Sequence, residues 1–415
     1  MGHARLVDKP STKEYPNFLK QLISKTQKLT EDDHPIVIKM DEKDAKAKLE
    51  ETVKDRQVNS IADNYDEQYA ELLLSQNAHL YRANFSVQKE SIRKLLGKHY
   101  GKKQPWQLGS WVYFPWNKTL AHVLSQSDFE QLRSIRNRDL ITNEEQKKLA
   151  EFKVACFGMS VGSAGALALA ISGISRQIKL IDGAVISGSN LNRILTGVPS
   201  VGEQKCRVVG RQIYEMNPYS EVEYFDKATA GNIEEILGGD NPVDLAIDEI
   251  DDIEMKLKIR LQAKKLQIPV LMATELADTV MLDIERFDLE PSRKIFHGKI
   301  KEVEKVAARP PKNYREWTKL AVGIIDPINM PLRMQKSLLK IGTNIVTHPQ
   351  LGSTVMVTGG ILAFAAKNIA LGQSLNSGRY VISLEKTFLA EHKTIRHRRS
   401  HKKHTKIIKK SVSSM

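Results

Sequence analysis

The most constraining stretch of this 415-residue chain runs from Val154 to Arg193 (VACFGMSVGSAGALALAISGISRQIKLIDGAVISGSNLNR). A short apolar run is followed by a Gly/Ser-rich turn, an Ala/Leu-rich helical run to Ile174 and a second strand-like run from Gln177. This β–turn–α–β order, with Asp182 about 20 residues beyond the turn, predicts a nucleotide-binding unit. The N–H groups of the turn and the positive N-terminus of the helix would suit a phosphate.

The uncharged run 154–174 is also long enough to cross a bilayer. Its Gly/Ser cluster lies near the start and charged sequence follows, so we interpret it as a buried strand, turn and helix. Met1 to Pro10 lacks the apolar core of a secretion signal, and Leu6 stands where a myristoylation signal has Ser or Thr. We therefore expect a cytoplasmic protein with no membrane partner.

Cysteine count and charge limit the class of protein further. Two cysteines, Cys156 and Cys206, exclude a disulfide scaffold and a four-cysteine zinc site, so no zinc is expected. Much of the net charge of +14 lies in 392–410 (HKTIRHRRSHKKHTKIIKK). Residues 392–415 are predicted to form a basic, flexible tail. The alternative is salt-sensitive contact with nucleic acid or another polyanion.

Composition divides the rest of the chain into segments. Residues 1–80 are polar and helical, and 81–130 are compact and aromatic-rich, with tryptophans interpreted as core. Together they predict an additional N-terminal α+β domain. Residues 131–375 are predicted to be the nucleotide-binding domain, and 376–391 a closing strand or segment. Thr142 and Glu145 have the spacing of a capping box, which predicts a helix leading into the first strand.

Strand and helix signals alternate beyond Asp182. EVEYF (221–225) and VDLAI (243–247) predict a third and a fourth strand, with a short helix at 232–237 between them. The carboxyl edge of such a sheet is where ligands bind, and one carboxylate there would hold Mg²⁺ against a triphosphate. The alternative is that these acids simply open a helix. The acids that follow the fourth strand are Asp248, Glu249, Asp251 and Asp252.

Several motifs together resemble the ThiF/MoeB/HesA group of ubiquitin-activating-type adenylyltransferases. In chain order they are RSIRNR (133–138), SNLNR (189–193), VGEQK (201–205), NPY (217–219), AIDEIDD (246–252), IPVLMAT (268–274) and the apolar run 349–372. LDIERFDLEP (282–291) is similar to a ThiF-type branch in which this domain can be joined to a nitroreductase-like domain. The resemblance implies a Rossmann-like, doubly wound, mostly parallel α/β sheet.

The resemblance also implies the residues of an ATP site. Asp182 would bind the ribose, and Asp251 would organise Mg²⁺ and the reacting α-phosphate. Arg136, or Arg138, would reach the γ-phosphate of the partner subunit's ATP across a homodimer. The residues implied to contact the phosphates are Asn190, Arg193 and Lys205.

The glycine loop departs from the family pattern G-x-G-x-x-G. Counting from Gly158 puts Ser160 in the second position. Keeping Gly162 as the third glycine instead leaves Phe157 and Met159 in the first two positions. Either way the close approach of backbone to phosphate is altered.

The implied reaction is attack of a substrate carboxylate on the α-phosphate of ATP, giving an acyl-adenylate and pyrophosphate without a cysteine thioester step. The expected acceptor is the C-terminus of a ubiquitin-like or sulfur-carrier protein. A carboxylated tRNA base, as in the family's tRNA threonylcarbamoyl-adenosine dehydratases, is an alternative. An NAD-dependent oxidoreductase shares the βαβ start but leaves SNLNR and Lys205 unexplained. A catalytically silent scaffold is the remaining alternative, which the altered loop permits.

Overall fold

The computed structural model describes residues 16–17, 19, 32–309, 311 and 313–414. They fall into two compact units. Of the described residues, the C-terminal unit contains Lys148–Val209 and those from Glu221 onward, and the N-terminal unit contains those up to Lys147 together with Gly210–Ser220. Residues 1–10, on which the prediction about a secretion signal rests, lie outside the described residues.

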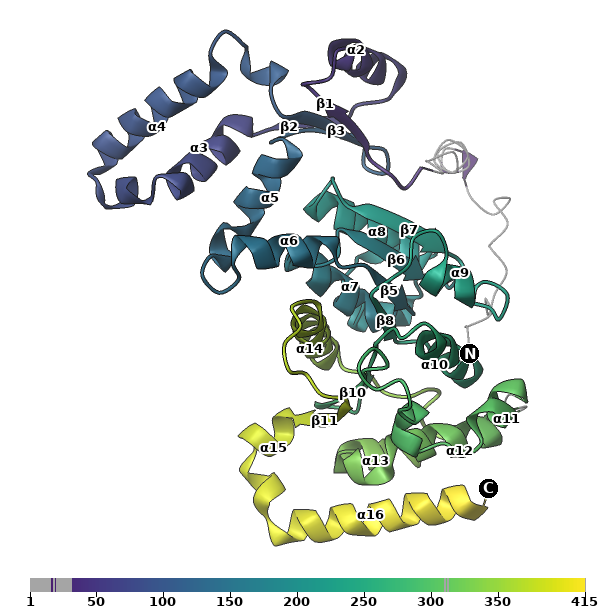
Figure 1. The fold of residues 1–415 in the computed structure, drawn as a ribbon. Coiled ribbons are helices and arrows are strands. Elements are labelled where there is room, and N and C mark those ends of the chain that lie inside the picture. Colours follow the sequence, from purple (N-terminus) through teal and green to yellow (C-terminus); the bar gives the residue numbers. More distant parts are fainter. Residues whose placement is uncertain (1–15, 18, 20–31, 310, 312, 415) are drawn as a thin grey trace. The chain divides into compact units, whose positions relative to one another are not determined.

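A seven-stranded sheet in the order β11-β10-β9-β8-β5-β6-β7 forms the centre of the C-terminal unit (Figure 1). Its strands are β5 (Val154–Phe157), β6 (Gln177–Ile181), β7 (Glu221–Phe225), β8 (Leu245–Asp248), β9 (Val270–Glu275), β10 (Thr279–Glu285) and β11 (Gly378–Ser383). The strands β7, β6, β5, β8 and β9 are parallel, whereas β10 and β11 are added by antiparallel pairing. The predicted doubly wound, mostly parallel sheet is confirmed, and its strand order reverses between β5 and β8.

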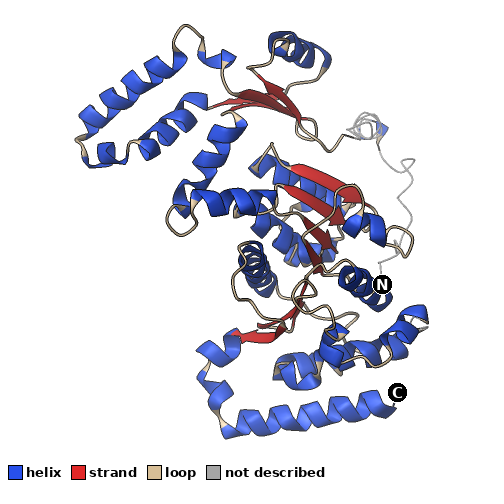
Figure 2. Cartoon of the chain, in the orientation of Figure 1, coloured by secondary structure: helices blue, strands red, loops and turns tan. Residues whose placement is uncertain are grey.

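Helices cover both faces of this sheet (Figure 2). The helices α9 and α10 share a buried apolar cluster with β5, β8 and β9, whereas α14 packs on α7. Helices on both faces are expected, because right-handed crossovers run on opposite faces on either side of the reversal. The α-helices of this unit are α7 (Gly162–Ile171), α9 (Ile233–Gly238), α10 (Ile253–Lys265), α11 (Val303–Ala308), α12 (Tyr314–Ile325), α13 (Leu332–Leu338), α14 (Gly352–Ala370), α15 (Leu384–Phe388) and α16 (Ile395–Ser414). The boundary between the two units falls within two further helices, α6 (Asn143–Glu151) and α8 (Lys205–Met216).

The helix α14 corresponds to the predicted closing apolar run. Among the described residues it is the one helix long and apolar enough to cross a membrane, with a mean hydropathy of 1.3, and half of that window is buried in the protein. A Cβ added to Gly359 would lie 2.6 Å from the carbonyl oxygen of Ala164 on α7. The two helices approach closely because glycine has no side chain there, and α14 is packed as a core helix.

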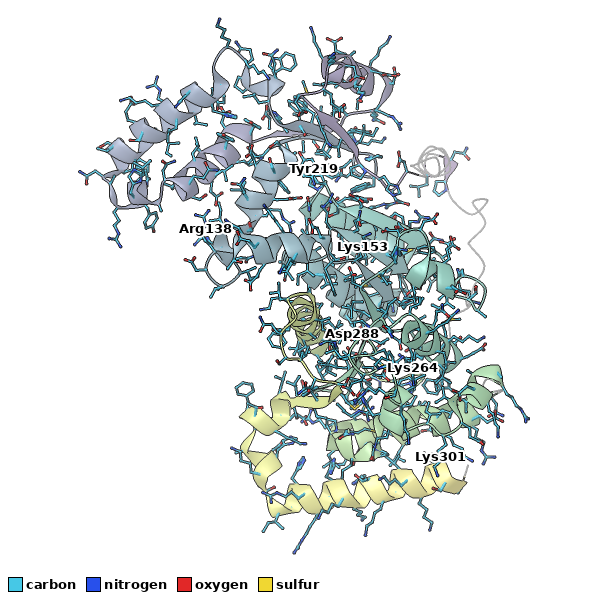
Figure 3. The ribbon with its side chains drawn as sticks, in the orientation of Figure 1. Arg138, Lys153, Tyr219, Lys264, Asp288 and Lys301 are labelled. Atoms are coloured by element: carbon cyan, nitrogen blue, oxygen red, sulfur yellow. The ribbon has the colours of Figure 1, made fainter. Side chains whose placement is uncertain are left out.

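The N-terminal unit is built on a four-stranded sheet in the order β1-β3-β4-β2. Its elements are β1 (Ile36–Lys39), α2 (Ala45–Asp55), β2 (Ser60–Asp63), α3 (Tyr65–Gln76), α4 (Phe85–Tyr100), β3 (Ser110–Phe114), β4 (Thr119–Val123), α5 (Gln126–Ser134) and the short 3-10 helices η2 (Ala78–Arg82), η3 (Pro105–Gln107) and η4 (Ile135–Asn137). Since β1 pairs with β3 and β2 with β4, the predicted segments 1–80 and 81–130 fold together where they are described. The Tyr219 hydroxyl, labelled in Figure 3, donates to the Leu124 carbonyl at 2.6 Å and ties 210–220 to this unit.

The C-terminal residues differ from the predicted flexible tail. Residues 395–414 form α16, which runs beside α12 and α13 (Figure 1). Thr405 and Ile408 are buried, and His401 Nε2 lies 2.9 Å from the Met330 carbonyl oxygen. The flexible tail was predicted from the high charge of the segment alone. His401, Thr405 and Ile408 lie at helical spacing, on one face of α16, and this face packs on the neighbouring helices.

Candidate nucleotide site

A glycine turn joins β5 to α7 at the point where the strand order of the sheet reverses. Gly158 has a φ of +87°, and a Cβ there would lie 2.5 Å from the carbonyl oxygen of Glu249. Residue 158 therefore has to be glycine on both conformational and steric grounds. The Ala164 N–H donates to the carbonyl oxygen of Val161, the N-cap of α7, at 3.0 Å. The earlier N–H groups of the first turn have no acceptor within the helix, which makes this edge a suitable place for an anionic group.

The altered second position of the loop has a defined role. The hydroxyl oxygen of Ser160 accepts a hydrogen bond from Arg193 Nε at 3.1 Å. Gly162, at the start of α7, lies over the side chain of Glu249, because an added Cβ would be 3.2 Å from the Glu249 Cβ. A serine at this position limits how closely the backbone can approach a phosphate, but its hydroxyl fixes Arg193 beside the turn.

Asp182 lies directly after β6 and holds the glycine turn in place. Its Oδ2 accepts from the backbone N–H of Met159 and its Oδ1 from that of Ala184, each at 2.7 Å. The carboxylate is 13% exposed, and Lys205 Nζ lies 3.8 Å from Oδ2. Each oxygen of an ionised carboxylate accepts more than one hydrogen bond, so acceptor capacity remains for a ribose.

Arg193 connects the SNLNR segment to the glycine turn. Besides the bond to Ser160, its Nη1 donates to the Ser189 carbonyl oxygen at 3.1 Å and to Asn192 Oδ1 at 3.0 Å. Within the described residues its Nη2 donates to no acceptor, so two N–H groups stay available on a fixed guanidinium. Burial lowers the pKa of Arg193, and the carboxylates of Asp251 and Glu275 oppose that shift.

The Lys205 side chain lies beside Asp182, whereas the Asn190 side chain bonds within its own 3-10 turn. Lys205 begins α8 with its N–H bonded to the Ala184 carbonyl, and its ammonium lies beside Asp182. Asn190 is 4% exposed, and its Oδ1 accepts from the N–H of Ser187, closing a capping box at that 3-10 turn. Asn190 therefore shapes the SNLNR segment, and its predicted contact with phosphate stays a prediction.

The acids at and after the end of β8 have separate roles, which sequence alone left open. Asp248 is fully buried between Arg260 and Lys256. Burial would raise the pKa of Asp248, but these two cations outweigh it and lower the pKa. Asp252 caps α10, where its Oδ1 accepts from the Met255 N–H at 3.2 Å.

Asp251 and Asp252 are both exposed, but the carboxylate of Asp251 has no hydrogen-bond or ion-pair partner among the described residues. Its backbone carbonyl accepts from Trp317 Nε1 at 3.2 Å, which fixes the chain at this position. Where the structure describes the chain, no three His, Cys, Asp or Glu side chains cluster as a metal cage. Mg²⁺ in nucleotide sites usually uses one or two carboxylates plus substrate phosphates, so a single free Asp251 fits that ion.

A pair of acids that was not predicted as a pair lies beside these residues. Glu249 Oε1 accepts from the Ala273 N–H at 2.7 Å, and Glu275 ends β9 with 8% of its surface exposed. Glu275 Oε1 is buried without a partner among the described residues. Burial, and the neighbouring Asp251 charge, raise the pKa of Glu275 to about 7. Burial and Glu275 likewise raise the pKa of Glu249. The only sequence signal for Glu275 is its place at the end of the IPVLMAT strand.

Arg136 and Arg138 belong to the N-terminal unit. Arg138, labelled in Figure 3, donates through Nη1 to the Ser75 carbonyl oxygen at 3.0 Å. Arg136 is exposed on η4, and its side chain has no partner in the part of the chain that the structure describes. Of the two arginines, Arg136 is the one left available to a ligand.

Neither cysteine is suited to covalent chemistry. Cys156 and Cys206 are both buried and free. Burial raises the pKa of Cys206 to about 11 and the pKa of Cys156 further. Neither thiol is ionised near neutral pH, and only the thiolate is a good nucleophile.

Comparison with known proteins gives relatives of both known and unknown activity. The chain is 34% identical over 275 residues to the uncharacterized protein MT1398 of Mycobacterium tuberculosis, covering 65% of this chain and 37% of that protein. It is 30% identical over 176 residues to the tRNA threonylcarbamoyladenosine dehydratase of Bacillus subtilis, covering 40% of this chain and 68% of the relative. The chain thus spans little more than a third of the mycobacterial protein.

Solved structures resemble part of this chain at low identity and low TM-score. The crystal structure of E. coli MccB with ATP is 18% identical, with a TM-score of 0.40, over 58% of this chain and 63% of MccB. That of E. coli TcdA, a tRNA N6-threonylcarbamoyladenosine dehydratase, is 17% identical, with a TM-score of 0.40, over 58% of this chain and 94% of TcdA. The model of the ThiF family matches residues 132–406, which include the whole sheet and every residue around the glycine turn. This chain therefore belongs to the ThiF family, whose adenylyltransferase-like fold it has.

Proposed function

We propose that this chain is an ATP-dependent adenylyltransferase that converts a substrate carboxylate to an acyl-adenylate. The observation that carries the proposal is the fixed guanidinium of Arg193. Its Nε donates a hydrogen bond to Ser160 of the glycine turn. Its Nη2 makes no hydrogen bond within the described residues. Fixed, charged donors beside a helix N-terminus are what a polyphosphate requires.

The reaction makes one bond and breaks one bond at the α-phosphorus. An oxygen of the substrate carboxylate attacks that phosphorus, and the oxygen bridging to the β-phosphate leaves with pyrophosphate. No general base is needed, because the attacking carboxylate is already ionised. Arg193 and Lys205 would hold the phosphates and offset the charge of the leaving group, so positioning and electrostatics supply the rate.

Mg²⁺ would be held by Asp251 together with the phosphates, and it would supply further charge neutralisation. Asp182 would accept hydrogen bonds from the ribose while it holds the turn through Met159. The buried thiols of Cys156 and Cys206 favour adenylation without a thioester step.

The acceptor we propose first is the C-terminal carboxylate of a small ubiquitin-like or sulfur-carrier protein. A carboxylated tRNA base is the second candidate, favoured by the 30% identity to the Bacillus subtilis tRNA threonylcarbamoyladenosine dehydratase. Adding tRNA that carries N6-threonylcarbamoyladenosine to the protein and α-labelled ATP distinguishes the two. Labelled AMP with this tRNA, and none with unmodified tRNA, is the outcome expected of the second candidate alone.

We further propose a homodimer in which Arg136 of one subunit reaches the γ-phosphate of ATP bound by the other. The support is that Arg136 is exposed and unpartnered among the described residues, whereas Arg138 is bonded to Ser75.

Calorimetric titration of ATP into Arg193→Ala and Lys265→Ala variants tests the site. Lys265 is 65% exposed on α10 and pairs with Glu234 at the surface, so its removal changes the net charge equally but leaves the turn intact. Losing charged hydrogen bonds to phosphate should weaken ATP binding about ten-fold or more in Arg193→Ala only. Equal affinities in the two variants, with unchanged melting temperatures, would contradict the proposal.

A further inference from the structure

The helix α16 carries a dense set of cations that the adenylation site does not use. Residues 392–415 contain no acidic side chain. The exposed cations of α16 are Arg396, Arg398, Arg399, Lys402, Lys403, Lys406, Lys409 and Lys410. A single helix thus provides eight positive charges in a protein whose net charge is +14.

Five of these cations form one stripe along the helix, which we call the basic stripe. They are Arg396, Arg399, Lys403, Lys406 and Lys410. Their spacing of three or four residues places them on one face of an α-helix. At a rise of 1.5 Å per residue, the basic stripe is about 21 Å long.

The opposite face of α16 fixes the helix to the rest of the C-terminal unit. His401 Nε2 lies 2.9 Å from the Met330 carbonyl oxygen, and Gln335 Nε2 donates to the Thr405 hydroxyl at 2.8 Å. Ile408 is 3% exposed. Because this face is docked, the basic stripe faces away from the protein as a fixed array.

Little negative charge neutralises this array from within the protein. Lys409, on the flank of the helix, pairs with Asp326 at 3.2 Å. None of the five cations of the basic stripe has an ion-pair partner among the described residues. Exposed Arg333 and Lys336 lie on α13, the helix against which α16 packs, and add two further positive charges to this part of the C-terminal unit.

We propose that the basic stripe of α16 binds the phosphate backbone of a nucleic acid. A nucleic acid offers a continuous row of phosphates, and its counterions are released when a row of fixed cations replaces them. A lipid surface fits less well, because an interfacial helix needs an apolar face and α16 exposes only the isolated Ile395 and Ile407 among its large apolar side chains. The inference goes beyond the proposed adenylation and does not depend on it.

Fluorescence anisotropy with labelled 20-base-pair RNA and DNA duplexes, at several salt concentrations, tests this inference on the full chain. The variant is Arg399→Gln, Lys403→Gln, Lys406→Gln. The matched control is Lys89→Gln, Arg93→Gln, Lys98→Gln, which removes the same charge from exposed positions of α4 in the N-terminal unit. Equal melting temperatures of all three proteins establish that folding is unaffected.

We expect the unaltered protein and the control to bind with a dissociation constant of about 10⁻⁶–10⁻⁴ M at physiological salt. The α16 variant should bind about ten-fold or more weakly, and the slope of log affinity against log salt should fall by about 3. Equal binding by variant and control would overturn the proposal. Binding of polyglutamate or of phosphatidylserine vesicles as tightly as the duplexes would overturn the choice of nucleic acid.

Discussion

Adjacent acids in this protein perform different tasks, and the difference lies in what each carboxylate already bonds. Asp252 caps α10 through the Met255 N–H, while Asp251 has no partner among the described residues. Only a carboxylate without a structural bond is available to a metal ion. The neighbouring pair therefore provides its own control for the proposed Mg²⁺ contact.

Asp251→Asn should abolish the dependence of ATP affinity on Mg²⁺, because a neutral amide is a weaker ligand for a hard cation. Calorimetric titrations of ATP with Mg²⁺ and with a chelator measure this dependence. Asp252→Asn is the control, since Asn and Asp are equally good N-caps and stability should change little. If Asp252→Asn, rather than Asp251→Asn, removes the Mg²⁺ effect, the assignment is wrong.

Glu275 should make stability depend on pH. Its pKa rises from 4.5 unfolded to about 7 folded, chiefly through burial. Below pH 4.5 it is neutral in both states and has no effect. As pH rises towards 7 the unfolded chain loses its proton first, so Glu275 destabilises the fold increasingly, by up to about 3 kcal/mol.

Glu275→Gln should therefore unfold at higher urea than the unaltered protein at pH 8, with the difference shrinking towards pH 5. The surface residue Glu234, 68% exposed, supplies the control Glu234→Gln. A difference for Glu275→Gln that stays constant from pH 5 to pH 8 would show that Glu275 is not protonated in the folded protein.

Single residues show where sequence reasoning stops. The SNLNR and VGEQK motifs predicted Arg193 and Lys205 as phosphate contacts, and the structure places Arg193 against Ser160 of the glycine turn and Lys205 beside Asp182. The motifs did not show that Ser160 would bond Arg193, nor that Asn190 would act as a cap. Both depend on a loop conformation that no local pattern encodes.

At the scale of elements, the contact of α7 with α14 sets a strict limit on side-chain size. A Cβ at Gly359 would meet the Ala164 carbonyl oxygen at 2.6 Å, whereas a Cβ at Gly360 would meet nothing within 4 Å. Of these two adjacent glycines, Gly359 has no room for a side chain, whereas Gly360 has room for one.

Gly359→Ala should destabilise the protein by about 1–3 kcal/mol, because backbone atoms have to move apart. Gly360→Ala should stabilise it by about 0.5–1 kcal/mol, because alanine loses less entropy in a helix. Urea unfolding of the two variants measures both changes. A destabilised Gly360→Ala with an unaffected Gly359→Ala would mean that α14 is rotated relative to the described packing.

Prediction of elements succeeded where periodicity was strong. The third strand was predicted at 221–225, where β7 lies, and the capping box forms, with the Thr142 N–H donating to Glu145 Oε2 at 2.8 Å. The helix α16 was missed because high charge is typical of disordered segments. Its docking depends on Gln335 and Met330, which are distant in sequence.

At the scale of the whole molecule, the fold class follows from motif order but the N-terminal unit does not. The two segments together predicted an additional N-terminal α+β domain, but composition did not indicate that its sheet joins β1 to β3 and β2 to β4 across long stretches of chain. Pairing between distant strands leaves no local signal in the sequence.

The proposed homodimer predicts a sedimentation mass of about twice 46.8 kDa. Arg136→Ala should weaken ATP binding, because a charged contact to the γ-phosphate is lost. Arg138→Ala is the control, since that side chain is bonded to the Ser75 carbonyl. A monomer that binds ATP with full affinity would refute the shared site.

Calorimetric titration of the purified protein with Mg·ATP and, separately, with NAD tests the proposed adenylyltransferase activity most directly. The arrangement of Arg193, Lys205 and Asp251 predicts micromolar binding of Mg·ATP and no binding of NAD. Absence of ATP binding at millimolar concentration would contradict the proposed activity. NAD binding in its place would indicate an oxidoreductase, and binding of neither would indicate a catalytically silent scaffold.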